Sequence, residues 1–193
     1  ANFHCESAMP AGEILAQLRR YLPEDIGIDS CRDVSPRFHA RLNAKEKTYC
    51  YRIWNSDSPC VFQRRFVAIM PEKLDVDAMN LAAKSLLEWN DFTTFAKLNS
   101  NNKTNICRVV KAEWRRSEDD ADLLVFTIRA DRFLRNMIRA IVGTLVDVGR
   151  GRYSVEDFER ILHSCDLSQS SAGAPAQGLF LSDVEYDEGV YLE

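Results

Sequence analysis

The stretch from residue 133 to 151 repeats its apolar residues at intervals of three and four, the period of a helix with one buried face. The residues in this pattern are Leu134, Met137, Ile138, Ile141, Val142, Leu145 and Val146. Gly149 and Gly151 close the stretch, and glycine is favoured just past the last turn of a helix. The pattern predicts a helix over 133–151 that must bury its apolar face against other elements.

The remaining segments alternate between helical and strand patterns. Helices are expected at 10–22, at 75–89 with Asp75 as its cap, and after Ser154, which forms an [ST]xx[DE] capping pattern with Asp157. Strands are expected at 26–34, at 47–55 and 60–70 as two strands joined by a turn, at 106–116 and 122–130 as a hairpin, and near 179–181. This mixture predicts an α+β fold with a largely antiparallel sheet and helices packed on it.

Composition narrows the class of protein. The chain has 193 residues, of which 46% are hydrophobic, so it can bury a sizeable core. No apolar run approaches the ~20 residues of a membrane span, which favours an intracellular, cytoplasmic protein with no membrane partner. The six cysteines are scattered without a paired spacing and are interpreted as free thiols. Neither these cysteines nor the three histidines form a cluster suited to a metal.

Charge is distributed unevenly along the chain. Residues 37–65 contain seven basic and two acidic side chains, whereas residues 150–193 contain three basic and nine acidic ones. A basic middle segment is suited to an anion such as a phosphate backbone. Charge alone nevertheless favours the simpler alternative, a solvated surface.

Two groups of residues suggest chemistry. In a strand over 47–54, one face carries Lys47, Tyr49, Tyr51 and Ile53, so a base could stack on tyrosine while cations hold phosphates. The alternative is a structural pair of cross-strand aromatics. The helix over 133–151 and the residue before it carry a basic stripe of Arg132, Arg135 and Arg139, spaced three and four residues apart. A partly buried Arg139 would need an anionic partner, which is a structural carboxylate, a catalytic carboxylate or a phosphate.

Four ordered motifs resemble one family. The run "FHARLNAKEKTYCYRI" at 38–53 resembles the FHAR…AxxRxYxYxI stretch of the tRNA pseudouridine synthase A family, and "DFTTF" resembles its DFxxF. The stretch "FLRNMIRAIVGTLVDVGRG" resembles its FLxxMVRxIVGxLxxVGxG, and "APAQGLFL" resembles its APAxGLxL. With "YLPEDI" matching LPxDI, the resemblance extends from about residue 20 to about residue 186, in the order of the family.

The resemblance implies an activity and roles for particular residues. Family members convert uridine to pseudouridine at positions 38 to 40 of the tRNA anticodon stem-loop, without cofactor or metal, and act as homodimers with a pseudouridine synthase fold. By motif match, Tyr49 stacks on the target uracil and is a candidate for the proton transfers, while Arg139 pairs with the catalytic aspartate. Arg41, with His39 and Lys47, is expected to contact the RNA, and Leu179 to line the uracil pocket.

One departure from the family limits what this chain is expected to do. The catalytic aspartate of the family lies in an RTDAGVHA motif, which is absent from the 193 residues. The expectation is therefore a C-terminal fragment, with residues 1–35 as the remnant of the N-terminal catalytic domain and residues 36–193 as the C-terminal domain. Such a fragment is expected to be inactive alone. The alternative is a non-catalytic module that binds RNA or self-associates; a small-molecule hydrolase explains none of the motifs.

Overall fold

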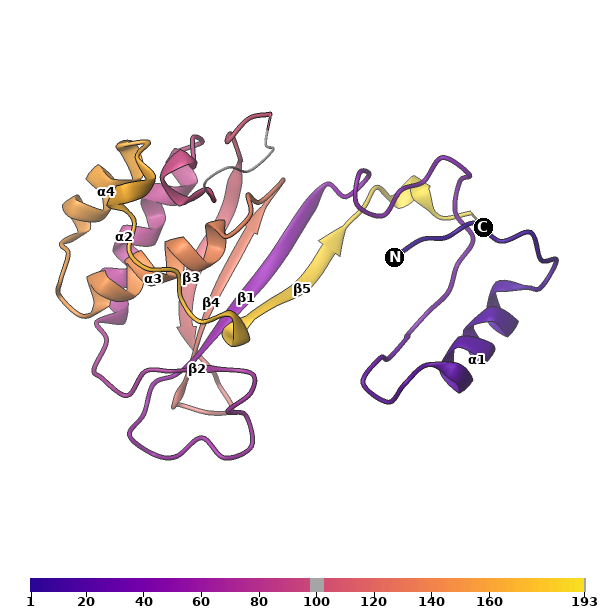
Figure 1. The fold of residues 1–193 in the computed structure, drawn as a ribbon, viewed down its shortest axis with the longest axis horizontal. Helices are drawn as coiled ribbons and strands as arrows, with labels where there is room; N and C mark the ends of the chain where they lie inside the picture. The colour runs from indigo at the N-terminus through magenta and orange to yellow at the C-terminus, as the bar shows by residue number, and fades with distance from the viewer. Residues whose placement is uncertain (98–102, 193) are drawn as a thin grey trace. The chain divides into compact units, whose positions relative to one another are not determined.

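The computed structural model describes residues 1–97 and 103–192 (Figure 1). The chain divides into two compact units. Unit 1 combines Ala1–Lys45 with Glu185–Glu193, and unit 2 is Glu46–Val184. The predicted division at residue 35, which assigns the segments to domains of a parent protein, stays a prediction.

Unit 2 is built on a mixed sheet. In the described residues its central strand, β1 (Glu46–Trp54), pairs antiparallel with β4 (Leu123–Ala130), which in turn pairs antiparallel with β3 (Val109–Arg116). The short β2 (Ala68–Ile69) pairs parallel with β1, and β5 (Leu179–Glu185) also pairs with β1. The predicted hairpin of 106–116 and 122–130 is confirmed, as is the α+β class with a mostly antiparallel sheet.

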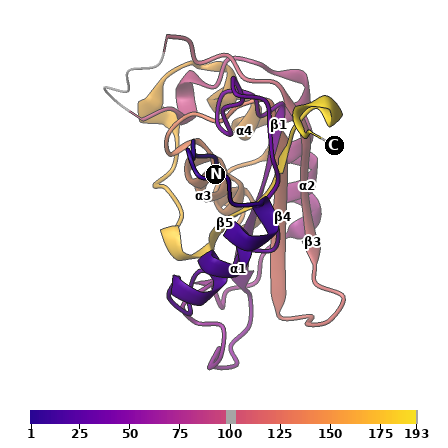
Figure 2. The same ribbon diagram turned by 90° about the vertical axis from the view of Figure 1, so that its right-hand side faces the viewer.

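Three helices form a layer on one face of this sheet (Figures 1 and 2). They are α2 (Val76–Glu88), α3 (Met137–Gly149) and α4 (Val155–His163). The predicted caps are present, since the Asp75 side chain accepts from a backbone N–H of α2, and Ser154 forms the predicted capping box on α4. Within the part of the chain that the structure describes, no helix has the length and apolar character needed to cross a membrane.

The two faces of the sheet differ in polarity because side chains alternate along each strand. Tyr51 and Ile53 of β1 lie fully buried under the helices, as do their partners Phe126 and Leu124 on β4. The opposite face carries polar pairs such as Cys50 and Thr127, whose side chains are 3.8 Å apart. The predicted face shared by Lys47, Tyr49, Tyr51 and Ile53 is thus the face that the core packs on.

The helix predicted over 133–151 begins four residues later than expected, at Met137. Asn136 precedes α3 with a φ of 69°, a left-handed conformation that asparagine tolerates and that a right-handed helix cannot continue. Arg132 and Arg135 therefore lie before the helix, and the predicted basic stripe of Arg132, Arg135 and Arg139 on one helix is wrong. The end is as predicted, with Gly149 last in the helix and Gly151 at a φ of 71°.

The predicted strand over 60–70 is also largely wrong. Only Ala68 and Ile69 are extended, and residues 61–65 form turns. Because β2 runs parallel to β1, the chain must reverse twice between them, and the short turn expected at 56–59 cannot make that connection. The antiparallel partner of β1 is instead β4, which lies far along the chain.

Unit 1 contains the predicted first helix but not the predicted strand. Helix α1 (Ala11–Tyr21) follows Pro10, as expected, yet none of its residues is buried. In residues 26–34 only Val34 pairs with another segment, through an isolated bridge to Tyr191. A strand needs a continuous neighbouring strand for its N–H and C=O groups. Here the Asp33 carbonyl accepts from the Leu192 N–H beside the bridge, and the Ile28 and Asp29 carbonyls accept from the Arg19 side chain. The predicted strand over 26–34 is therefore wrong.

The helix layer makes a prediction about stability. Leu86 and Leu87 are adjacent in α2, but Leu86 is fully buried and Leu87 is 44% exposed. Replacing a buried leucine by alanine costs about 2–5 kcal/mol. We therefore expect Leu86→Ala to lower the free energy of unfolding by that amount in urea denaturation followed by circular dichroism. The matched variant Leu87→Ala should stay within about 0.5–1 kcal/mol of the wild type, and equal losses in both variants would contradict this packing.

Candidate active site

Tyr49 lies at the border of the core rather than within it. Its strand position on β1 is opposite Ile128 of β4, and its side chain is half-buried. The ring of Phe133 meets it edge-on, with the ring centroids 5.2 Å apart and the planes at 81°. An edge-to-face contact holds an aromatic ring in a defined orientation. Tyr49 is thus a fixed, partly exposed ring on the helix-covered face of the sheet.

Lys47, two residues before Tyr49 on the same face, is held by a loop carbonyl. Its Nζ donates to the backbone oxygen of Asp131 at 3.4 Å. The Asp131 carboxylate is itself occupied, because its Oδ1 accepts from the backbone N–H groups of Arg108 at 2.8 Å and Arg132 at 2.7 Å. The side chain of Asp131 therefore stabilises the loop whose backbone oxygen accepts from Lys47.

The start of β1 is surrounded by charge. Glu46 pairs with Arg129 at 2.5 Å and with Arg108 at 3.5 Å. Its side chain is only 18% exposed, whereas that of Arg108 is 75% exposed. One carboxylate thus holds two guanidinium groups beside Lys47, and the net local charge is positive. This end of β1 is suited to an anionic ligand.

Arg139 is placed by the first turn of α3 and by the segment before β5. Its Nε donates to the backbone oxygen of Ala174 at 2.6 Å, and the Ala174 N–H donates to the Arg139 carbonyl at 2.9 Å. Within residues 1–97 and 103–192, no carboxylate forms an ion pair with Arg139. The guanidinium is therefore oriented through Nε, and its two terminal nitrogens can serve an external anion.

Tyr51 lies between Tyr49 on β1 and the segment that orients Arg139. It is fully buried, and its hydroxyl donates to the Pro175 carbonyl at 2.7 Å. Burial raises the pKa of Tyr51 well above its ordinary value, and the positive charge of Arg139 opposes part of that rise. Tyr51 thus stays protonated, and it lies two residues from Tyr49 on the same face of β1.

Leu179 begins β5 beside β1 and packs against the core. The residue before it, Gly178, is in close contact with β1: a Cβ added there would lie 2.7 Å from the carbonyl oxygen of Arg52 and 3.0 Å from the Tyr51 ring. Glycine is therefore required for this approach. The close contact fixes the start of β5, and with it Leu179, next to Tyr51.

Arg41 and His39 belong to unit 1. Both are exposed, and Nδ1 of His39 accepts from the backbone N–H of Arg41 at 3.2 Å. The turn that carries them is anchored by Tyr186, whose hydroxyl donates to the carbonyl of Ala40 at 2.7 Å and whose ring meets Phe38 edge-on. The other four predicted site residues, Lys47, Tyr49, Arg139 and Leu179, belong to unit 2.

Three contributors to this site were not predicted from the sequence. Phe133 is an aromatic side chain that no sequence pattern singled out, whereas alternation had already placed Tyr51 on the same face as Tyr49. The Ala174 and Pro175 carbonyls carry no side-chain signal at all. Among the described residues, no group of three or more His, Cys, Asp or Glu side chains could hold a metal ion.

Comparisons with known proteins agree on one family. The family model described as tRNA pseudouridine synthase matches residues 82–187. A protein of Bacteroides thetaiotaomicron named tRNA pseudouridine synthase A is 43% identical over 193 residues, which are 100% of this chain and 71% of that protein. A Bacteroides fragilis protein of the same name is 43% identical over 99% of this chain and 75% of its own length. The Bacillus anthracis protein tRNA pseudouridine synthase A 2 is 36% identical over 96% and 75%.

The buried phenol of Tyr51 makes a prediction about pH. Because its pKa is higher in the folded than in the unfolded chain, its contribution to stability is present below the ordinary tyrosine pKa of about 10 and is lost as the pH rises above it. We expect the free energy of unfolding of the wild type to fall more steeply above pH 10 than that of Tyr51→Phe, by up to about 1.4 kcal/mol per pH unit. Urea denaturation at stepped alkaline pH measures both slopes.

The control for this experiment is Tyr21→Phe, because Tyr21 is 75% exposed. Its slope above pH 10 should match that of the wild type. Equal slopes for the wild type and Tyr51→Phe would show that the phenol ionises as easily in the folded chain as in the unfolded one.

Proposed function

This chain belongs to the tRNA pseudouridine synthase family, and we propose that it provides most of the active site of an enzyme that isomerises uridine to pseudouridine in tRNA. The observation that supports this best is the placement of Arg139. Its guanidinium is oriented by a backbone carbonyl and has no carboxylate partner in the described part of the chain. This is the arrangement that a catalytic carboxylate from another segment would need.

The reaction assigns a task to each residue of the site. The glycosidic bond between N1 and the ribose carbon breaks, the base turns, and C5 becomes bonded to that carbon. The hydrogen of C5 then leaves as a proton, and N1, no longer bonded to the ribose, gains a proton. Tyr49 stacks on the uracil, and its edge-on contact with Phe133 keeps the ring ready for the flipped base. Arg139 keeps the catalytic aspartate ionised through its positive charge. Leu179 lines the uracil pocket.

The nucleophile is the missing component. No RTDAGVHA motif occurs in the 193 residues, and the chain spans 71% to 75% of the lengths of the relatives named above. We assign the aspartate to the part of the relatives' length that this sequence does not match. Without that part, the chain is expected to be inactive.

The tRNA would be held by the cations of both units. Lys47 and Arg108 at the start of β1, together with Arg41 and His39 in unit 1, are the groups proposed to contact it. The substrate region proposed is the anticodon stem-loop at positions 38 to 40. The active form proposed is a cytoplasmic homodimer that uses no cofactor. The second candidate, a non-catalytic module that binds RNA or self-associates, is favoured by the missing aspartate motif alone.

Tritium release from tRNA labelled at uracil C5 tests the proposal directly, because isomerisation must expel that hydrogen. We expect release by a longer protein in which the aspartate segment precedes this sequence, and no release by the 193-residue chain. In the longer protein, Arg139→Ala should slow release at least ~100-fold, since it removes the positive charge that keeps the aspartate ionised. Arg135→Ala is the matched control, because Arg135 is exposed and close by, and it should stay within about threefold.

Two results would change the assignment. Release by the 193-residue chain would mean that its own residues include the nucleophile. If neither protein releases tritium but both bind tRNA, the result would favour the binding module over the enzyme.

A further inference from the structure

Helix α3 is buried along all but one stripe. Of its 13 residues, only Arg139, Gly143 and Asp147 are not buried. They are spaced four residues apart, so they lie above one another on one side of the helix. Arg139 is the proposed catalytic residue at one end of this stripe, and Asp147 lies at the other end, about 12 Å away along the axis.

The segment before β5 lies along this stripe and runs antiparallel to α3. Ser171 Oγ donates to Asp147 Oδ2 at 2.8 Å, and Ala174 exchanges two hydrogen bonds with Arg139. Between these contacts the segment touches the helix at Gly143, where an added Cβ would lie 2.2 Å from the Ala172 carbonyl oxygen. The glycine thus lets the segment lie directly on the helix. We define residues 171–175 as the strap.

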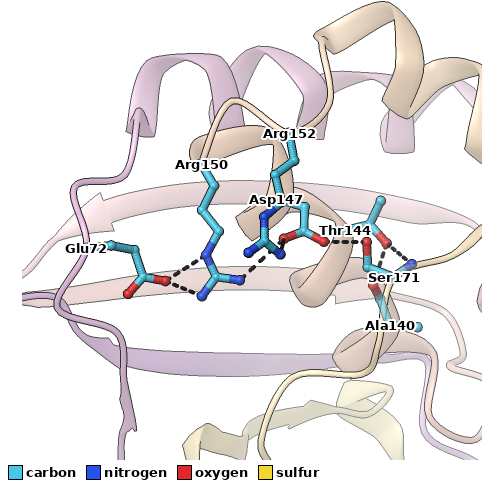
Figure 3. A network of polar contacts seen from close by, with 7 residues as sticks. All are labelled: Glu72, Ala140, Thr144, Asp147, Arg150, Arg152 and Ser171. Carbon is cyan, nitrogen blue, oxygen red and sulfur yellow. Dashed lines mark hydrogen bonds and ion pairs between the residues drawn. The ribbon is translucent and has the colours of Figure 1, made fainter.

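The Asp147 end of the strap is firmly anchored (Figure 3). The Asp147 side chain is 14% exposed, and its Oδ1 accepts from Arg152 at 3.0 Å and from Arg150 at 3.3 Å. Arg150 also donates through Nε to Glu72 at 2.6 Å. The two arginines occupy one carboxylate oxygen, so the other oxygen is available for Ser171. A nearly buried carboxylate with three donors is a rigid acceptor.

The backbone of Ser171 makes a second contact. Its N–H donates to Thr144 Oγ1 at 3.2 Å, and the Thr144 hydroxyl donates to the Ala140 carbonyl at 2.9 Å. Thr144 is fully buried, so this acceptor cannot move without the helix. Figure 3 shows Ser171 between Asp147 and Thr144, bonded to both. Ser171 is thereby fixed on α3 through its side chain and its backbone.

The other end of the strap touches the proposed catalytic machinery. The Ala174 carbonyl accepts from Arg139 Nε, and the Pro175 carbonyl accepts from the buried Tyr51 hydroxyl. An arginine side chain has several rotatable bonds, so its guanidinium is aimed only as well as its acceptor is placed. A misplacement of about 1 Å can cost two orders of magnitude in rate.

We propose that Ser171 and Asp147 are positioning residues for the isomerisation. Their hydrogen bond fixes the strap on the open stripe of α3, and the strap in turn fixes the Ala174 carbonyl that orients Arg139. This proposal rests on the proposed function of Arg139. Neither residue touches the substrate, and both act through the strap alone.

The first test measures Arg139 directly and needs no activity. In ¹⁵N-labelled 193-residue chain, the Nε–H signal of Arg139, assigned by its loss in Arg139→Lys, reports the bond to Ala174 through its exchange with water. We expect Ser171→Ala and Asp147→Ala to speed this exchange about tenfold or more, because each removes the same bond from the strap. Ser171→Thr, which keeps a hydroxyl, should retain slow exchange.

Two variants serve as controls in this test. The hydroxyl of Ser170 donates to the Leu167 carbonyl and does not contact α3, so Ser170→Ala should leave the exchange unchanged. Arg152→Ala removes a largely exposed ion-pair partner of Asp147 and leaves both partners of the Ser171–Asp147 bond present. It should therefore also leave the exchange unchanged. An exchange rate in Ser171→Ala and Asp147→Ala equal to that of the wild type would overturn the proposal.

The second test uses the longer protein. With tritium release as the readout, Ser171→Ala should lower kcat about tenfold with KM for tRNA within about twofold, because the strap orients a catalytic group and not the RNA. It should have little further effect in an Arg139→Lys background, in which the Nε–H is absent. A raised KM with unchanged kcat, or full additivity with Arg139→Lys, would contradict the positioning role. An inactive wild type would refute the proposed function. The exchange measurement would still test whether the strap orients Arg139, because it needs no activity.

Discussion

The packing of α3 determines much of unit 2. Ten of its 13 residues are buried, so the helix cannot rotate or slide without opening the core. Its three remaining residues, Arg139, Gly143 and Asp147, therefore lie in fixed places along one stripe. Because the strap is hydrogen-bonded to two of them and lies against the third, the start of β5 and the position of Arg139 both follow from the burial of α3.

The sheet contributes the second half of the site through alternation along β1. Tyr51 and Ile53 are fully buried, and the same face continues outward through Tyr49 to Lys47. Moving along the strand, the environment changes from apolar core to a half-buried aromatic ring and then to cations. For a nucleotide whose base stacks on Tyr49, as we propose, these cations are suited to its phosphates.

The sequence predicts elements well where local signals and tertiary packing agree. The apolar period of α3, the caps Asp75 and Ser154, and the hairpin of β3 and β4 are all found as expected. The predictions fail where the partner decides the structure. Residues 26–34 have a strand-like composition but form one isolated bridge, at Val34. Residues 60–70 mostly form turns, since β1 pairs with β4 on one edge and with the short β2 and β5 on the other.

The roles proposed for Tyr49 and Arg139 come from the motif resemblance and stay predictions, because periodicity alone left both with structural alternatives. The basic stripe expected from Arg132, Arg135 and Arg139 fails because a single left-handed residue, Asn136, delays the helix. The carbonyls that hold Arg139 and Tyr51 are backbone atoms, which no side-chain pattern reveals. Their placement depends on the folded position of the strap.

In the function that we propose, Arg139 is held ready for a carboxylate that lies outside these 193 residues. A crystal structure of the longer protein would test it most directly, by the distance from the terminal nitrogens of Arg139 to the nearest carboxylate. We expect an aspartate of the added segment within about 3 Å of the guanidinium, on the side of Tyr49, with Nε still bonded to the Ala174 carbonyl. A carboxylate of unit 2 in that place, or an Arg139 directed away from Tyr49, would contradict it.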